Sequence, residues 1–208
     1  MDYIKSLEKR YSAKKFTAEK VPSEVVSRIL NAGRLSASSL GLQPYKIYVL
    51  ESKEALEKVE PAFFNPSQVK SCSHLFVITA KKDIEDHYIE GYLKHITQVR
   101  EQSIESLEGF KTSIQGFRTK IGAERLWDWS KNQTYIVLGH LLFAAALENI
   151  DSSPMEGFDD KILTNALPID PAKEWPSVTL ALGYRSPEDP FQTLKKVRKP
   201  EEKLIEFL

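Results

Sequence analysis

The sequence has little that would cross-link the chain, carry it through a membrane or attract it to nucleic acid. A single cysteine, Cys72, excludes an intramolecular disulfide, and 29 basic against 29 acidic side chains leave no basic footprint for nucleic acid. The longest apolar stretch, 135–147, is shorter than the roughly 18–20 residues of a membrane span. The charged first ten residues lack the apolar core of a secretory signal. We therefore expect a cytoplasmic protein that binds neither membranes nor nucleic acid.

The short motifs of several enzyme classes are also missing. Neither G-x-G-x-x-G nor G-x-x-x-x-G-K-[ST] occurs, so both standard nucleotide loops are absent, and there is no G-x-S-x-G elbow. Cys72 lies beside an apolar run without a C-x-x-C partner, and we interpret it as a core residue. His140, within an apolar helix, is interpreted as a core histidine. We interpret Asp83, His87 and Glu90 as a solvated helix surface and predict no metal site.

Hydrophobic periodicity predicts a few strands among many helices, in one domain covering residues 1–208. The predicted strands are 45–50, 74–80, 178–182 and a terminal strand at 204–208. The predicted helices are 2–10, one opened by Pro22, 52–59, 83–120 with weak breaks at Gly109 and Gly116, 123–149 and 159–166. This pattern is typical of the α/β or α+β class.

The second half of the long helix predicted at 123–149 is apolar on every face. It includes Ile136, Val137, Leu138, Leu141, Leu142, Phe143, Ala144, Ala145, Ala146 and Leu147. A helix that is apolar all round must be buried all round. It lies either against a second subunit or at the centre of a monomer, and the pattern alone leaves both arrangements open.

Three polar segments could carry binding chemistry. Arg10–Lys14 (RYSAK) places two cations and a hydroxyl at a helix end, Ser36–Tyr45 (SASSLGLQPY) offers small hydroxyl groups, and Lys196–Pro200 (KVRKP) is basic. Each segment taken singly also has an ordinary explanation: a solvated helix end, a loop and an exposed tail.

Together with Phe63–Gln68 (FFNPSQ) and Pro154–Asp159 (PMEGFD), these segments stand in the order found in the nitroreductase family. The chain resembles the oxygen-insensitive NAD(P)H nitroreductase and dihydropteridine reductase branch over nearly its whole length. The resemblance implies an α+β sandwich whose central mixed, mostly antiparallel sheet is flanked by helices. It also implies an intertwined homodimer, with a C-terminal segment from about 185 to 208 wrapping onto the partner. FMN would lie at the dimer interface and touch both subunits.

The resemblance also implies which cations serve the cofactor. Arg10, Lys196 and Arg198 match family residues that hold the FMN phosphate, a dianion that favours charge-assisted hydrogen bonds. Lys14 matches the lysine beside flavin N1 and O2. A fixed positive charge there stabilises the negative charge of the reduced ring.

Further FMN contacts are implied along the chain. Ser38 and Ser39 match positions contributed by the other subunit, and Asn65 matches a side chain at the pyrimidine edge. Glu156 and Gly157 match a turn whose backbone amides face flavin N5. The remaining matched positions are Tyr11, Ser12, Gly41, Gln68 and Pro154.

Three positions depart from the best-known relatives. Tyr11 stands where they have histidine, and this position acts largely through its backbone. Gly41 stands where they have asparagine, so one flavin contact is lost. Gln68 stands where they have a second lysine near N1 and O2. A neutral donor in place of a cation predicts a somewhat lower flavin potential.

The function implied is an NAD(P)H-dependent flavin oxidoreductase that reduces nitroaromatics, quinones or similar flat aromatic acceptors by a ping-pong two-electron mechanism. NADH and NADPH are both open as donors. No protein residue is assigned as catalytic, because the cofactor carries the chemistry. Two alternatives stay open: a specialised dihydropteridine, quinone or flavin reductase, and a non-catalytic FMN-binding protein. Candidate aromatics for the pocket wall, or for simple core packing, are Phe63, Phe64, Phe110, Phe117 and Trp129.

Overall fold

The computed structural model describes residues 2–208 and is organised around a four-stranded sheet in the order β1-β2-β4-β3. The strands are β1 (Tyr45–Leu50), β2 (His74–Lys81), β3 (Asp151–Met155) and β4 (Glu174–Gly183). All three pairings are antiparallel, and a single parallel bridge joins Ser12 to Ser152 at the β3 edge. The mixed, mostly antiparallel sheet and the α+β class are thereby confirmed.

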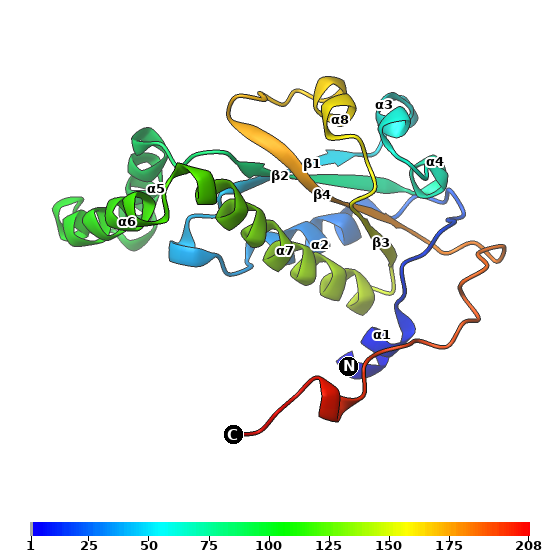
Figure 1. Ribbon diagram of the computed structural model, residues 1–208. Coiled ribbons are helices and arrows are strands. Elements are labelled where there is room, and N and C mark those ends of the chain that lie inside the picture. The colour runs from blue at the N-terminus through cyan, green and yellow to red at the C-terminus, as the bar shows by residue number, and fades with distance from the viewer. Residues whose placement is uncertain (1) are drawn as a thin grey trace.

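Helices cover both faces of the sheet (Figure 1). The helices α2 (Ser23–Arg34) and α7 (Ala123–Leu147) share one apolar cluster with β2 and β4. The helices α3 (Lys53–Val59), α4 (Ser67–Ser71) and α8 (Asp160–Ala166) lie over the other face, whose cluster includes Cys72 as predicted. Strand β2 is therefore buried on both sides, which explains its continuous apolar run.

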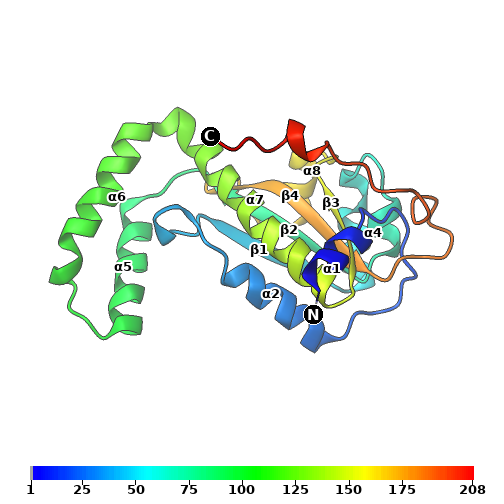
Figure 2. The same ribbon diagram turned by 90° about the horizontal axis from the view of Figure 1, so that it is seen from below.

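A helical hairpin extends from one end of this body (Figure 2). It consists of α5 (Asp86–Arg100) and α6 (Glu108–Ile121), with an apolar cluster of its own. The prediction of one helix at 83–120 with breaks at Gly109 and Gly116 was wrong. The break falls at 101–107, where Glu101 takes a left-handed conformation, while both glycines lie inside α6. An interior glycine weakens a helix by only about 1 kcal/mol and does not end it.

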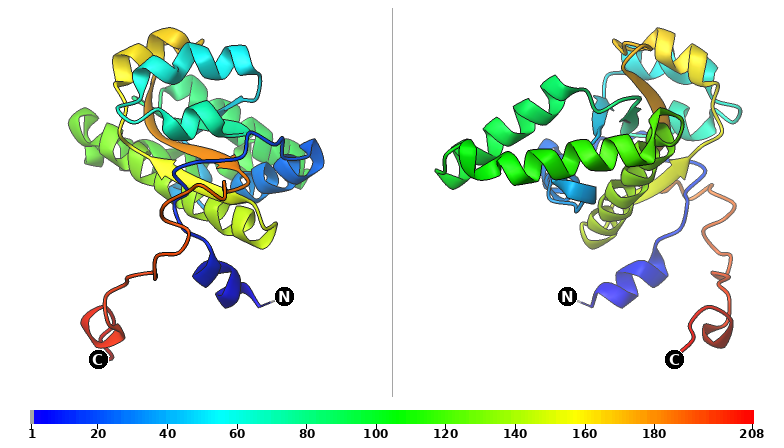
Figure 3. Two further views of the ribbon diagram at one scale, coloured as in Figure 1. Left: turned by 90° about the vertical axis from the view of Figure 1, so that its right-hand side faces the viewer. Right: turned by 60° about the vertical axis from the view of Figure 1, so that its left-hand side comes forward.

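The two ends of the chain lie on the same side of the body. Helix α1 (Tyr3–Lys9) is capped by Asp2, and residues beyond β4 run back past it to a short turn at Glu201–Lys203 (Figure 3). The predicted strand at 204–208 was wrong for this protomer: these residues are exposed and pair with no strand of the described chain. Strand β3 was not predicted, because it is short, largely polar and contains Pro154, which only an edge strand accommodates.

Helix α7 is buried along one side only. Val137, Leu141 and Ala145 are buried in the core, while Ile136 and Phe143 remain 40% and 37% exposed. The central position in a monomer, one of the two alternatives, is therefore excluded. His140 lies on the exposed side, so its interpretation as a core histidine was wrong; its Nδ1 lies 3.0 Å from the carbonyl oxygen of Ile136, one turn earlier in the helix. Among residues 2–208 no helix is long and apolar enough to cross a membrane.

Candidate functional site

Two segments from opposite ends of the sequence lie side by side next to the β3 edge (Figure 3). Phe16 forms an antiparallel bridge with Arg185, and the Ser186 amide donates to the Lys15 carbonyl at 3.0 Å. We call residues 184–198 the C-terminal strap. Further along it, the Lys196 ammonium donates to the carbonyls of Leu7 and Arg10 at the end of α1. The pairing brings the RYSAK and KVRKP segments together, as the predicted phosphate site requires.

Three cations gather where the C-terminal strap meets α1. Burial, followed by the charge of Arg198, lowers the pKa of Arg10, whose Nε is buried without a hydrogen-bond partner among the described residues. Burial, followed by Arg10 and Arg198, lowers the pKa of Lys196. Like charges disfavour one another's charged forms, so this cluster is suited to an anion with several oxygens. A phosphate would satisfy the free Arg10 donor and relieve the repulsion.

Lys14 lies at a cleft beyond these cations. The cleft has a volume of about 580 Å³ and is lined by Lys14, Lys15, Asn65, Ser67, Lys70, Ser71, Pro190 and Phe191. The Lys14 ammonium stands 5.8 Å from the centre of the Phe191 ring. Asn65 accepts a hydrogen bond from the Ser67 amide through Oδ1, at 3.2 Å, and its side-chain NH₂ remains available to a ligand.

Gln68 lies close to Lys14 but is buried under Ser67 and does not line the cleft. The Ser67 hydroxyl is 2.9 Å from Gln68 Oε1 and 3.0 Å from the Lys14 carbonyl. One hydroxyl hydrogen can serve only one of these two acceptors at a time. Gln68 is thus coupled to the Lys14 backbone, and its direct contact with the flavin stays a prediction.

The turn after β3 forms a separate part of the predicted site. Pro154 lies within β3, and the Glu156 carboxylate accepts a hydrogen bond from the Tyr135 hydroxyl on α7. The Gly157 carbonyl accepts from the Phe64 amide at 3.0 Å. The hydrogen bonds of the described residues use the carbonyls of Glu156 and Gly157, not their amides, so both amides are available to a ligand.

Of the five candidate aromatics, Phe64 alone is strongly exposed beside the site, at 77%. Phe63 belongs to the core under α3 and α8. Phe110, Phe117 and Trp129 lie in the helical hairpin and near the start of α7, where the rings of Phe117 and Trp129 pack at a tilt of 55° with 5.2 Å between their centres. Phe64 is therefore the best candidate for a pocket wall within one protomer.

Ser38, Ser39 and Gly41 lie at the opposite end of the sheet. The loop that holds them leads into β1, whose Tyr45 pairs with Ala80 at the far end of β2. Lys14 and the C-terminal strap lie near the other end, where His74 pairs with Leu182. The eight residues of β2 span roughly 25 Å, too far for one flavin ring to bridge.

Tyr11 and Ser12 connect the cations to the sheet. Ser12 bridges β3, and the Tyr11 ring packs under the Arg185 guanidinium at 4.6 Å. Burial, followed by the charge of Asp189, raises the pKa of Tyr11 to about 12. Both residues hold the RYSAK segment in place, and a contact of the Tyr11 backbone with the flavin stays a prediction.

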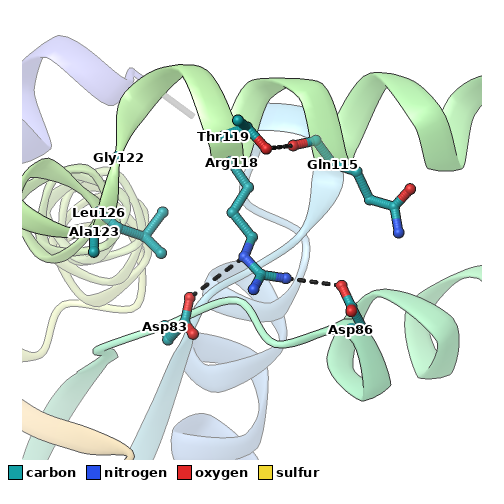
Figure 4. A pocket seen from close by; sticks show the side chains of 8 residues that line it. All are labelled: Asp83, Asp86, Gln115, Arg118, Thr119, Gly122, Ala123 and Leu126. Atoms are coloured by element: carbon teal, nitrogen blue, oxygen red, sulfur yellow. Dashed lines mark hydrogen bonds and ion pairs between the residues drawn. The ribbon is translucent and has the colours of Figure 1, made fainter.

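A second pocket, of about 530 Å³, lies between the helical hairpin and the start of α7 (Figure 4). Arg118 projects into it and pairs with Asp86 at 2.8 Å and Asp83 at 3.7 Å. None of the predicted FMN residues lines this pocket. Because two carboxylates already neutralise its single arginine, it is less suited to an anion than the cation cluster at the C-terminal strap.

Reasoning from the sequence missed several residues around the candidate site, and three of them position its other residues or line its cleft. Asp189 accepts the Lys14 amide at 2.6 Å, Phe191 lines the cleft, and Tyr135 holds Glu156. Asp189 precedes a proline and is typical of a turn residue. No spacing pattern indicates a hydrogen bond that joins positions 175 residues apart.

The fold and the site define an α+β protein in which paired chain ends build a cluster of cations beside a cleft. The model of the nitroreductase family matches residues 7–184, and the chain belongs to that family. A Staphylococcus saprophyticus protein named as an NAD(P)H nitroreductase is 36% identical over 96% of this chain and 93% of its own length.

Solved structures show the same fold. A Bacillus subtilis protein described as a nitroreductase superposes with a TM-score of 0.88 at 18% identity, over 100% of this chain and 99% of its own. An Exiguobacterium sibiricum protein, described as a nitroreductase in complex with FMN, superposes with a TM-score of 0.87 at 21% identity, over 100% and 98%. These likenesses confirm the nitroreductase-like fold.

Proposed function

We propose that this protein is an FMN-dependent oxidoreductase that uses NADH or NADPH to reduce flat acceptors such as nitroaromatics and quinones. The observation that carries the proposal is the cluster of Arg10, Lys196 and Arg198 beside the cleft of Lys14. Relatives named as NAD(P)H nitroreductases, and the FMN described in a structural neighbour, support the same activity. When bound, FMN supplies a ring that accepts and returns two electrons.

Different residues of this chain would bind different parts of FMN. Arg10, Lys196 and Arg198 bind the phosphate, which fits the unpartnered Arg10 Nε. Lys14 places a positive charge at the pyrimidine side of the ring, where reduction adds negative charge. The free amides of Glu156 and Gly157 would be the donors that the turn after β3 offers to the flavin. No protein acid or nucleophile is required, since these residues bind, orient and polarise.

The functional unit is a homodimer. Ser38, Ser39 and Gly41 lie at the opposite end of the sheet from Lys14, with the roughly 25 Å length of β2 between the two ends, so they reach the flavin only from a partner. The exposed face of α7, with Ile136 and Phe143, provides the apolar surface that a partner would cover. The C-terminal segment from about 185 to 208, whose residues 193–208 are exposed in this protomer, would then wrap onto that partner.

NAD(P)H and the acceptor would bind in the same cleft one after the other, as in a ping-pong mechanism. Donor and acceptor would both have to reach the flavin held beside Lys14, Asn65 and Phe191, so they would bind in turn. Phe64, exposed beside the Gly157 turn, provides an apolar wall for nitroaromatic and quinone rings. Parallel kinetics with nitroaromatics, quinones and dihydropteridines would separate a broad nitroreductase from a specialised reductase.

Colour and bleaching test the proposal directly. The purified dimer should be yellow, or become yellow with added FMN, and should bleach under anaerobic conditions with NADH or NADPH. Adding a nitroaromatic or a quinone should then restore the yellow colour at the rate of turnover. Protein that binds FMN but resists both donors would instead be a non-catalytic flavin binder. Protein that cannot be loaded with FMN would refute the proposal.

A further inference from the structure

Asp189 is a buried carboxylate that joins the C-terminal strap to the Lys14 backbone. Its side chain is 2% exposed. Oδ2 accepts the Lys14 amide at 2.6 Å and the Lys15 amide at 3.2 Å, and Oδ1 accepts the Phe191 amide at 2.8 Å. One side chain thus fixes the backbone of three residues that line the cleft, Lys14, Lys15 and Phe191.

The carboxylate of Asp189 remains ionised although it is buried. Burial opposes the charge, but the amides of Phe191, Lys14 and Lys15 outweigh it and hold the pKa of Asp189 below its ordinary value. The Tyr11 hydroxyl acts in the same direction. Because charge-assisted hydrogen bonds are about twice as strong as neutral ones, this anion is a firm anchor for the three amides.

Apart from the Ser67 hydroxyl at its carbonyl, Lys14 has few other restraints, and its ammonium has the fewest. In the part of the chain that is described, no carboxylate forms an ion pair with its ammonium, which contacts the Phe191 ring at 5.8 Å. Phe191 is itself held through its amide by the same Asp189. The position of the Lys14 charge therefore depends on Asp189 at both ends: directly at the backbone, and through Phe191 at the ammonium.

We infer that Asp189 is a positioning residue that places the Lys14 ammonium against the flavin pyrimidine and so sets the reduction potential of the cofactor. The inference rests on the proposed function. A well-placed cation stabilises the reduced ring, so displacing Lys14 lowers the potential. Removing a nearby anion with no positioning role would do the opposite, because it would leave the surroundings more positive. The sign of the shift therefore separates the two roles.

The test measures the midpoint potential of FMN-loaded protein in a double-mutant cycle. Asp189→Asn keeps the size of the side chain but removes the charge and one acceptor, and we expect a lower potential than in the wild type. Lys14→Met should also lower it. Since Asp189 acts through Lys14, adding Asp189→Asn to Lys14→Met should lower the potential no further. Glu188→Gln is the matched control: Glu188 is the adjacent carboxylate, exposed and paired with Lys15, so its removal should leave the potential unchanged or slightly raised, and should not lower it.

Asp189→Glu provides a second variant if Asp189→Asn does not fold. It keeps the negative charge but moves the acceptor oxygens, so a lower potential in this variant reports positioning alone. An unchanged or raised potential in both variants, or shifts that add in the double mutant, would overturn the inference. Wild-type protein that binds and bleaches FMN in the same experiment would leave the proposed function standing. Wild-type protein that binds no FMN would overturn both.

Discussion

The hydroxyl of Tyr135, on the exposed face of α7, donates a hydrogen bond to the carboxylate of Glu156 in the turn after β3. Burial, followed by the bond to Glu156, raises the pKa of Tyr135 to about 12, so the hydroxyl stays a donor at any physiological pH. The contact ties the turn to the longest helix of the described chain. The amides of Glu156 and Gly157 thereby gain a fixed direction toward the cofactor that we propose.

Tyr135→Phe should slow flavin reduction. A hydrogen bond to a charged group contributes about 1.5–3 kcal/mol, and losing part of it from the turn predicts a fall of about tenfold in the rate of bleaching by NAD(P)H. Anaerobic stopped-flow absorbance measures this rate. Tyr48→Phe is the control, since Tyr48 donates a similar bond to Glu174 at 2.6 Å, away from the site. Equal rates in the wild type and Tyr135→Phe would show that the turn needs no support from α7.

Gly41 is enclosed by a tyrosine from the helical hairpin. Its φ is +69°, and a Cβ at this position would collide with the Tyr92 hydroxyl, which donates to the Leu40 carbonyl at 3.2 Å. The Tyr92 hydroxyl thus gives a steric reason why this chain has glycine where the best-known relatives have asparagine.

Gly41→Ala should destabilise the protein by about 1–2 kcal/mol from the left-handed backbone alone, with the collision in addition. Urea unfolding measures the change. In a Tyr92→Phe background the cost of Gly41→Ala should be smaller, because the atom nearest the new methyl is gone. Gly116→Ala is the control: it lies in α6 with open space around it and should not destabilise. A cost of Gly41→Ala that is unchanged by Tyr92→Phe would refute the steric explanation.

Arg198 should contribute affinity for the phosphate of FMN and not for its ring. Its guanidinium donates to the carbonyl of Val197 in its own segment, so its removal should disturb little else. Loss of a charge-assisted bond of about 1.5–3 kcal/mol predicts that Arg198→Met raises the Kd of FMN roughly 10- to 100-fold. Riboflavin, which has the ring without the phosphate, should bind both proteins equally. Fluorescence quenching titrations measure both ligands, and equal losses for both would contradict a phosphate role.

The buried anion of Asp189 predicts a specific pH dependence of stability. Because its folded pKa is lowered, it contributes stability that is complete above its ordinary value of 3.8 and is lost as the pH falls through the lowered value. The free energy of unfolding should therefore be higher for the wild type than for Asp189→Asn at pH 7. The difference should narrow below about pH 4. Urea unfolding across this range measures it, and a difference independent of pH would contradict an ionised Asp189.

The family resemblance carried by the ordered segments predicted that the cations of the site gather, but not the bonds that position them. Arg10 and Lys196 were predicted from the RYSAK and KVRKP segments, and the structure brings them together. Asp189 was missed, because its partners are backbone amides, which almost every residue carries. Tyr135 was missed for a similar reason: it precedes an apolar run, and only the packing of α7 against β3 brings it to Glu156.

The fold, like the site, was predicted from the sequence only in part. Strands β1, β2 and β4 were predicted, since their apolar runs are long enough to identify. Strand β3 depends on pairing with β4 and not on its own composition, so local propensity provided no signal. The terminal strand predicted at 204–208 has an apolar pattern but pairs with no strand of the described chain. A segment of this kind forms a strand only when its backbone can hydrogen-bond to the edge strand of a sheet.

The exposed face of α7 leads to a prediction about assembly. Ile136→Glu places a charge in the centre of the surface that we propose a partner covers, where an unpaired buried charge is strongly unfavourable. The variant should elute as a monomer, which light scattering detects. It should also lose FMN, because Ser38 and Ser39 would no longer reach the Lys14 cleft.

Val49→Glu is the matched control for this substitution. Val49 and Ile136 are both 40% exposed in the protomer, but Val49 lies on β1 and not on α7. Val49→Glu should remain dimeric and yellow. A dimeric Ile136→Glu variant with wild-type FMN affinity would place the interface elsewhere. A monomeric variant that retains FMN would show that one protomer completes the site, and would require another role for the Ser38 loop.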